Sequence, residues 1–267
     1  MTLLLDGATR LHFIVGDPIA QVKSPGGVTR MLQDAGRNAL VVPAHVAPAD
    51  LAAFVQGAGL IRNVDGIIVT VPHKIAMTAL CATLSDRAAF LGAVNTLRRN
   101  ADGTWHGDMF DGLGYVAALE EKGVSLAGRN VLLAGAGGAG SAIAHALVEA
   151  GVARLAIHEQ DHARRDALIE RLARLGKAGI QAGSPNLTGF DIAINATPTG
   201  MKEGDPIPFD MASLTPSHIV GDVITQPVVT PLIEVARARG CVTVIGTDMF
   251  AKVRDLMVAY LLANPSG

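Results

Sequence analysis

One stretch of ten residues decides the fold of this chain: Val131-Leu132-Leu133-Ala134-Gly135-Ala136-Gly137-Gly138-Ala139-Gly140. An apolar strand runs into the pattern G-x-G-x-x-G, and a helical pattern follows. The first glycine permits a tight turn, the second lets the backbone approach a pyrophosphate, and the third lets the helix pack on the strand. The helix N-terminus adds unpaired N–H groups for the anion. The pattern predicts cofactor binding by Gly135, Gly137, Gly138, Ala139 and Gly140; a glycine turn that only packs helix on strand is the alternative.

An acidic residue ends the next expected strand, about 20 residues further on, as the dinucleotide pattern requires. This residue is Glu159, and Asp161 adds a second negative charge beside it. A carboxylate there accepts hydrogen bonds from the ribose hydroxyls and repels a 2′-phosphate. Arg164 and Arg165 follow, but we expect them to face solvent from the next helix. We therefore expect NAD to be favoured over NADP.

A rival motif shares these residues, because His158-Glu159-Gln160-Asp161-His162 matches H-E-x-x-H. On a helix this pattern places two histidines on one face, where they bind zinc in peptidases. Here His158 closes an apolar strand, so the two histidines straddle a strand-to-helix turn. The zinc peptidase is therefore a remote alternative, and we expect no metal ligands.

Composition excludes several other classes of protein. The chain has 267 residues, of which 49% are hydrophobic and 17% charged, with a net charge of −2. This balance excludes a disordered chain and gives no basic surface for nucleic acid. Two cysteines and a start without a signal-peptide pattern favour the cytoplasm. Residues 130–148 lack charge over the length of a membrane helix, but the glycine cluster favours strand, turn and helix, so we expect no membrane contact.

Apolar strands alternate with helical patterns along the whole chain. This alternation predicts an α/β fold with parallel sheets covered by helices. Ser24 is expected to be the N-cap of the first helix, with Pro25 at its first position. Residues 94–106 read as a hairpin around Asn100-Ala101-Asp102-Gly103. The expected strands are 11–15, 40–42, 66–71, 130–134, 154–159, 190–195, 219–223 and 242–245. The expected helices are 24–36, 48–58, 75–81, 86–91, 112–121, 138–150, 162–175, 231–239 and 249–262.

The series of strand–helix units breaks in or beside the helix at 112–121. We therefore expect two α/β domains with a cleft between them. The N-terminal substrate domain has a mainly parallel sheet and covers residues 1–113, completed by the C-terminal helix at 248–267. The second is a Rossmann-type dinucleotide-binding domain at residues 114–247.

Several short segments end at the expected cleft, and together they resemble the shikimate/quinate dehydrogenase family. The specific segments are Val69-Thr70-Val71-Pro72-His73-Lys74 and Asn195-Ala196-Thr197-Pro198-Thr199-Gly200-Met201. Others are Gly16-Asp17-Pro18-Ile19, Ala93-Val94-Asn95-Thr96 and the run from Gly107 to Gly114. The resemblance extends from Gly16 to the final helix, with the motifs in the family's order. It implies an NAD(P)-dependent oxidoreductase of aromatic amino acid biosynthesis.

The resemblance also implies roles for individual residues. Lys74 and Asp111 match the family's catalytic pair, and such a pair can take and return a hydroxyl proton during hydride transfer. The simpler alternative makes Lys74 a surface lysine and Asp111 an N-cap before Gly112. Further matches imply cofactor contacts at Asn195, Thr197 and Gly246. The implied substrate-binding positions are Ser24, Thr70, Asn95, Val22, Ile68, Phe110 and Val253.

Some of those positions depart from the family's pattern. Its S-x-S is Val22-Lys23-Ser24, its G-x-N-V-T has Ile68 for asparagine, and its N-T-D is Met109-Phe110-Asp111. A tyrosine becomes Thr225, and a glutamine of the last helix becomes Val253. Losing three or four hydrogen bonds costs about 2–6 kcal/mol of binding free energy. Shikimate is therefore expected to be a poor substrate, unless these residues face the core and Lys23 or Lys252 compensates.

The leading hypothesis is thus a reversible alcohol dehydrogenase of the shikimate type. Its partner is a cyclic hydroxy acid or related cyclic alcohol, and the chain is expected to be a monomer or homodimer. The alternative from another class of function is a catalytically idle, dinucleotide-linked sensor. It is suggested by the loss of several polar residues from the expected substrate pocket.

Overall fold

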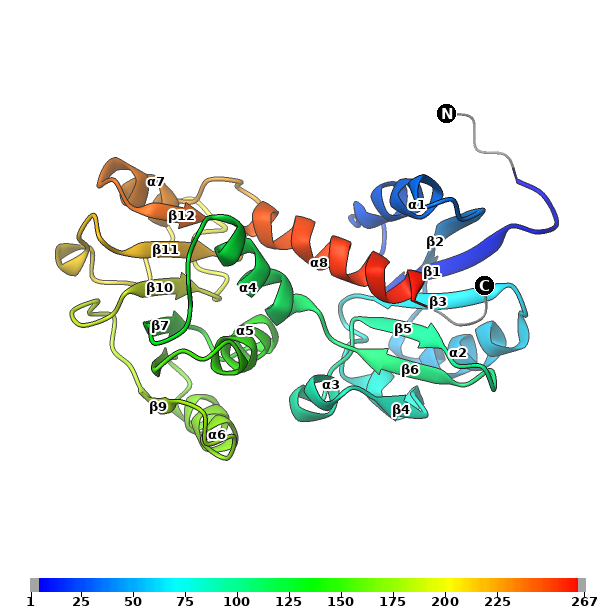
Figure 1. The fold of residues 1–267 in the computed structure, drawn as a ribbon, viewed down its shortest axis with the longest axis horizontal. Coiled ribbons are helices and arrows are strands. Elements are labelled where there is room, and N and C mark those ends of the chain that lie inside the picture. The colour runs from blue at the N-terminus through cyan, green and yellow to red at the C-terminus, as the bar shows by residue number, and fades with distance from the viewer. Residues whose placement is uncertain (1–4, 264–267) are drawn as a thin grey trace. The chain divides into compact units, whose positions relative to one another are not determined.

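The computed structural model describes residues 5–263 and contains two compact units (Figure 1). The first unit is Met1–Phe110 together with Arg254–Gly267, and the second is Asp111–Val253. These borders lie a few residues from those expected at 113/114 and 247/248. Residues 1–4 and 264–267 of the expected first domain lie outside the described part.

The first unit is built on a six-stranded mixed sheet in the order β2-β1-β3-β5-β6-β4. Strands β2, β1 and β3 are parallel, β5 is antiparallel to both β3 and β6, and β4 is parallel to β6. The bounds are β1 (Arg10–Gly16), α1 (Ser24–Asp34), β2 (Ala39–His45), η1 (Pro48–Asp50), α2 (Leu51–Leu60), β3 (Val64–Val69), η2 (Ala76–Leu80), β4 (Thr83–Leu84), α3 (Asp86–Leu91), β5 (Thr96–Arg99) and β6 (Trp105–Asp108).

The second unit is built on a six-stranded sheet, entirely parallel, in the order β12-β11-β10-β7-β8-β9. The final helix begins in this unit, and its residues from Arg254 onward belong to the first. The bounds are α4 (Asp111–Glu121), β7 (Asn130–Ala134), α5 (Gly138–Glu149), β8 (Arg154–His158), α6 (His162–Ala173), β9 (Gly179–Ala182), β10 (Ile192–Asn195), η3 (Met211–Ser213), β11 (Ile219–Asp222), α7 (Pro231–Ala238), β12 (Val242–Val244) and α8 (Gly246–Leu262).

Both faces of the parallel sheet are buried, which explains why its strands are apolar without alternation. Leu132 and Ala134 of β7 pack in one cluster with Leu232 and Ile233 of α7, while their neighbour Leu133 is equally buried. The uncharged run at 130–148 forms β7, the glycine turn and most of α5, as expected. Within residues 5–263, no helix has the length and apolarity needed to cross a membrane.

The structure corrects some details of the expected elements. Ser24 is not the N-cap of α1, because Lys23 occupies that position and no side chain caps the helix. The segment expected as a helix at 75–81 is a short 3₁₀ helix, η2. Strands β4 and β9 were not expected: β4 has only two residues, and the mostly exposed β9 has no buried stripe to give a pattern.

The core of the first unit contains a buried histidine, His12. His12 of β1 is 4% exposed, and its Nδ1 has no hydrogen-bond partner. Burial lowers the pKa of His12 to about 4, while Asp65 opposes and Arg10 adds to the shift. As the pH falls, His12 of the unfolded chain is therefore protonated near pH 6.5, whereas His12 of the folded chain is protonated only near pH 4.

We therefore expect the free energy of unfolding to fall by about 3 kcal/mol between pH 6.5 and pH 4. Urea unfolding across this range measures the loss. In the His12→Leu variant this part of the pH dependence should disappear, whereas His162→Leu, at the exposed start of α6, should retain it. An identical pH slope in His12→Leu and the wild type would contradict the assignment.

Candidate active site

The glycine turn of the second unit has the geometry that a pyrophosphate needs. Gly135 has a φ of +102°, and a Cβ there would lie 2.7 Å from the carbonyl oxygen of Ala196. A Cβ on Gly140 would lie 2.1 Å from the Gly135 carbonyl oxygen, so α5 packs directly on the turn. A Cβ added at position 137 or 138 would meet no atom within 4 Å. The first and last glycines are therefore required by packing, and the middle ones leave space for a ligand.

A cavity of about 530 Å³ opens beside this turn, within the range of small-molecule sites. Four of the residues that the sequence predicts to bind the cofactor line it: Gly135, Gly137, Glu159 and Thr197. Its other wall is the segment Pro206-Ile207-Pro208-Phe209-Asp210, which sequence reasoning missed. The open backbone at the N-terminus of α5 and the adjoining cavity fit a dinucleotide.

Glu159 follows β8 and holds the turn through its carboxylate. It accepts hydrogen bonds from the backbone N–H of Ala136 at 2.9 Å and of Asp161 at 3.1 Å. Partial burial opposes ionisation, but these N–H groups and nearby Arg164 together lower the pKa of Glu159. Arg164 lies 3.8 Å from Glu159 and 3.3 Å from Asp161. Two carboxylates and one guanidinium leave this corner of the cavity with net negative charge.

Asn195 ends β10 and organises the loop that follows it. Its Oδ1 accepts hydrogen bonds from the N–H and hydroxyl of Thr197, and its Nδ2 donates to Asp222 at 3.2 Å. Burial raises the pKa of Asp222 against the hydrogen bonds from Ile224, Thr230 and Asn195. Asn195 is fully buried, so it shapes the loop, while Thr197 reaches the cavity.

The remaining expected cofactor residues lie near the turn or at the start of α8. Gly138 and Ala139 form the first turn of α5, whereas Gly246 packs so closely on β11's exit that a Cβ would lie 2.3 Å from the Ile224 carbonyl oxygen. None of these three lines the cavity.

The H-E-x-x-H match lacks the helix that zinc binding requires. His158 ends β8 and His162 begins α6, so the two histidines do not share a helical face. Glu159 between them serves the glycine turn. Within residues 5–263, no three His, Cys, Asp or Glu side chains gather as a metal site.

In the first unit, the carboxyl ends of β1, β2 and β3 are tied together by hydrogen bonds. The N–H of Thr70 donates to the Val15 carbonyl, and Asp17 donates to the Val71 carbonyl. Buried His73 contacts the Val46 carbonyl oxygen through Nε2 at 2.8 Å. The segment ending in Lys74 is therefore rigidly held at the edge where ligands of parallel sheets bind.

Lys74 and the residue before Asp111 are both attached to the same short segment. The Lys74 carbonyl accepts a hydrogen bond from the Val94 N–H at 2.9 Å. The next residue, Asn95, is fully buried, and its Oδ1 accepts the Phe110 N–H at 3.1 Å. Asp111 then begins α4. The backbones at positions 74 and 110 are thus each one hydrogen bond from the adjacent pair Val94–Asn95.

The expected substrate-binding residues fall into two groups. Within residues 5–263, the half-buried hydroxyls of Ser24 and Thr70 have no hydrogen-bond partner, and Val22, two residues before Ser24, is also half-buried. The apolar replacements are buried in packing: Ile68 lies in β3, Phe110 packs on Tyr260 with ring centroids 5.2 Å apart, and Val253 packs against Gly114.

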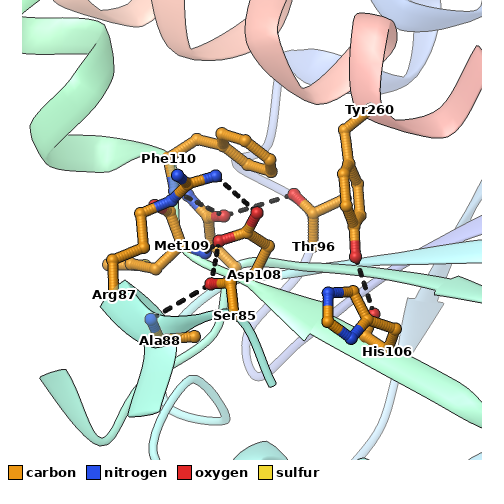
Figure 2. A network of polar contacts seen from close by, with 10 residues as sticks. Ser85, Arg87, Ala88, Thr96, His106, Asp108, Met109, Phe110 and Tyr260 are labelled. Carbon is orange, nitrogen blue, oxygen red and sulfur yellow. Dashed lines mark hydrogen bonds and ion pairs between the residues drawn. The ribbon is translucent and has the colours of Figure 1, made fainter. Parts of the chain in front are cut away.

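Sequence reasoning missed the polar residues that fix the connection into Asp111. Asp108 is 4% exposed and receives bonds from Ser85 and Arg87 (Figure 2). Arg87 reads in the sequence as a surface residue of a short helix, and no pattern in the sequence marks its partner.

A parallel sheet with this glycine turn, joined to a second α/β unit that carries a lysine at its sheet edge, defines a dinucleotide-dependent enzyme. The family model of the shikimate dehydrogenase substrate binding domain matches residues 14–97. The NADP shikimate dehydrogenase of Rubrobacter xylanophilus is 38% identical over 92% of this chain and 88% of its own. The chain belongs to the shikimate/quinate dehydrogenase family and is an NAD(P)-dependent oxidoreductase.

Two solved structures share nearly the whole fold. Shikimate 5-dehydrogenase from Listeria monocytogenes, in complex with shikimate and NAD, has a TM-score of 0.89 and 29% identity over 98% of both chains. The 5-ketofructose reductase of a Gluconobacter strain has a TM-score of 0.88 and 30% identity, covering 96% of this chain and 94% of its own. Two proteins with this architecture are therefore named for chemically different substrates, shikimate and 5-ketofructose.

Proposed function

We propose that Lys74 and Asp111 form the catalytic pair of a reversible secondary-alcohol dehydrogenase. One observation carries this proposal: the backbones of Lys74 and Phe110 both hydrogen-bond to the Val94–Asn95 segment. Phe110 belongs to the same unit as Lys74 and is the residue directly before Asp111. The family membership adds an activity that needs such a pair.

The cofactor, when bound, accepts or donates the hydride. The first turn of α5 would offer its N–H groups to the pyrophosphate, and Glu159 would accept hydrogen bonds from the ribose hydroxyls. Lys74 takes the hydroxyl proton during oxidation and returns it during reduction, while Asp111 orients the ammonium and stabilises its charged form. A positioned acid–base group contributes about 10²–10⁴-fold to the rate.

We propose a cyclic alcohol or ketone with fewer polar groups than shikimate as the substrate. Ser24 and Thr70 supply hydroxyls at the sheet edge, whereas Ile68, Phe110 and Val253 supply none. Asn95 Oδ1 is already occupied by the Phe110 N–H. Because Ile68, Phe110 and Val253 are buried in packing, the expectation that shikimate is a poor substrate rests only on the small number of hydroxyl partners, those of Ser24 and Thr70.

We propose NAD as the preferred cofactor because Glu159 is ionised beside the cavity. A 2′-phosphate would face its carboxylate, and Arg164, the nearest cation, is already shared between Glu159 and Asp161. Repulsion of this kind costs at least about 1.4 kcal/mol, which is tenfold in binding.

The two free cysteines, Cys81 and Cys241, fit the reducing cytoplasm, where we also place the enzyme. We propose a monomer or homodimer as its oligomeric state.

A kinetic panel tests substrate and cofactor together. We expect shikimate to give a kcat/KM below about 10⁴ M⁻¹s⁻¹, the lower end of the ordinary enzyme range. At least one simpler cyclic alcohol or ketone should exceed it, and NAD should exceed NADP by about tenfold or more. The panel comprises shikimate, quinate and less hydroxylated cyclic alcohols, each measured with both cofactors.

The Glu159→Gln variant isolates the charge in this comparison. The amide oxygen can still accept the Ala136 N–H and so hold the glycine turn, while the negative charge and the acceptor for the Asp161 N–H are lost. NADP should gain about tenfold in kcat/KM relative to NAD. Glu203→Gln, an exposed glutamate in the same unit, should leave the ratio unchanged. A wild-type preference for NADP would refute the cofactor proposal, and efficient turnover of shikimate would refute the substrate proposal.

A further inference from the structure

The short connection between β6 and α4 is held almost entirely by side chains. Met109 and Phe110 lie between the strand and the helix, so their N–H groups bond neither in the strand ladder nor within the helix. The Met109 N–H donates to Asp108 Oδ1 at 2.7 Å, and the Phe110 N–H donates to Asn95 Oδ1 at 3.1 Å. Side-chain partners therefore determine the path of the chain into Asp111.

Arg87, in the first turn of α3, contacts each residue of this connection (Figure 2). Its guanidinium forms an ion pair with Asp108. Its Nε donates to the Met109 carbonyl oxygen at 3.0 Å, and its guanidinium carbon lies 4.9 Å from the centroid of the Phe110 ring. One planar cation thus engages three consecutive residues, which a point charge could not do.

The contacts of Arg87 are reinforced from both sides. Ser85 donates its hydroxyl to Asp108 and accepts the Ala88 N–H, so the start of α3 and the connection share one hydrogen-bonded group (Figure 2). On the other side, the Phe110 ring packs on Tyr260 of α8, whose hydroxyl donates to the His106 carbonyl oxygen. Asp108 is nearly inaccessible to solvent, so its carboxylate depends on these partners.

We infer that Arg87 is a positioning residue for catalysis: by holding residues 108–110, it sets where the carboxylate of Asp111 is presented. This inference rests on the proposed role of Asp111. A displacement of about 1 Å in a catalytic group can cost about 10²-fold in rate. Loss of Arg87 should therefore lower the rate of the chemical step more than the affinity for the cofactor, because the glycine turn lies in the other unit.

The Arg87→Gln variant tests the inference with the best substrate and cofactor of the kinetic panel. We expect kcat to fall about 10–100-fold, with the Kd for dinucleotide within about twofold of the wild type. The pH profile of kcat/KM should shift by about half a pH unit or more, since the acid–base pair loses its alignment. Arg87→Lys retains the charge opposite Asp108 but not the bond to the Met109 carbonyl, so its kcat should be intermediate.

Arg37→Gln serves as the matched control, because Arg37 is an exposed arginine of the same unit. Its kcat and pH profile should equal those of the wild type. If Arg87→Gln does not fold, the kcat, the dinucleotide Kd and the pH profile of Arg87→Lys test the inference instead. A folded Arg87 variant with wild-type kcat and pH profile would overturn the inference, even if its melting temperature fell. The Asp111→Asn variant separates the two proposals. If Asp111→Asn is inactive while the Arg87 variants are fully active, only the positioning role of Arg87 is rejected. If Asp111→Asn is fully active, the proposed function is rejected.

Discussion

We expect the replacement of Lys74 with alanine to lower kcat by about 10²–10⁴-fold, because the proposed acid–base group is then lost. Asp111→Asn should have an effect of similar size, since the amide cannot stabilise the charged lysine. Stopped-flow and steady-state measurements of NAD(P)H absorbance give kcat for each variant. Dinucleotide affinity, measured by calorimetry, should stay near that of the wild type in Lys74→Ala, because the glycine turn belongs to the other unit.

The control for the lysine variant is Lys177→Ala. Lys177 pairs with Glu149 on the surface, where such a pair contributes little to stability. This variant should fold and turn over normally. A Lys74→Ala protein with near-normal kcat would contradict the assignment. Dinucleotide binding by the wild type without turnover of any compound in the panel would instead favour a sensor.

Two glycine substitutions in the same turn should have different effects: one should lower stability, and the other should weaken dinucleotide binding. Gly140→Ala places a Cβ 2.1 Å from the Gly135 carbonyl oxygen, so α5 or the turn must move. Backbone displacements of this kind cost several kcal/mol, and we expect a fall of about 3 kcal/mol or more in the free energy of unfolding. Thermal and urea unfolding measure this loss.

Gly137→Ala should leave stability almost unchanged and weaken dinucleotide binding. Its φ of −72° suits any residue, and a Cβ there meets no atom within 4 Å. The same open space is where a pyrophosphate would approach the backbone. We expect the dinucleotide Kd to rise at least about tenfold, as measured by calorimetry. If Gly137→Ala binds the dinucleotide as tightly as the wild type, the pyrophosphate does not lie over this turn.

The fold of the second unit could be predicted from sequence because its signals are local. The apolar run at 130–134, the glycine turn and the helix after it predict β7 and α5 to within a residue of their ends. β9 gave no such signal, since it is a mostly exposed edge strand with no buried face to impose a pattern. The cap of α1 was misplaced by one residue, because the helix begins at Ser24 itself and no side-chain hydrogen bond marks its start.

More of the cofactor cavity than of the proposed catalytic pair could be predicted from local motifs. Gly135 and Glu159 were expected to bind the cofactor from motif spacing, and Thr197 from the family resemblance; all three line the cavity beside the glycine turn, and their contact with a cofactor stays a prediction. The wall from Pro206 to Asp210 was not expected, because nothing in its composition links it to a turn some 70 residues earlier. The roles of Lys74 and Asp111 came from family resemblance, and they remain proposals to be tested by mutation.

By itself, the sequence determined the α/β alternation, the dinucleotide turn and the family, because each depends on residues close together along the chain. Only the tertiary structure decided which side chains hold the connection into Asp111. Arg87 lies in α3, Asn95 directly before β5 and Tyr260 in α8, and their contacts with residues 108–110 exist only after these segments pack. Such long-range contacts leave no periodic trace in a sequence, since any arginine or tyrosine satisfies the same local pattern.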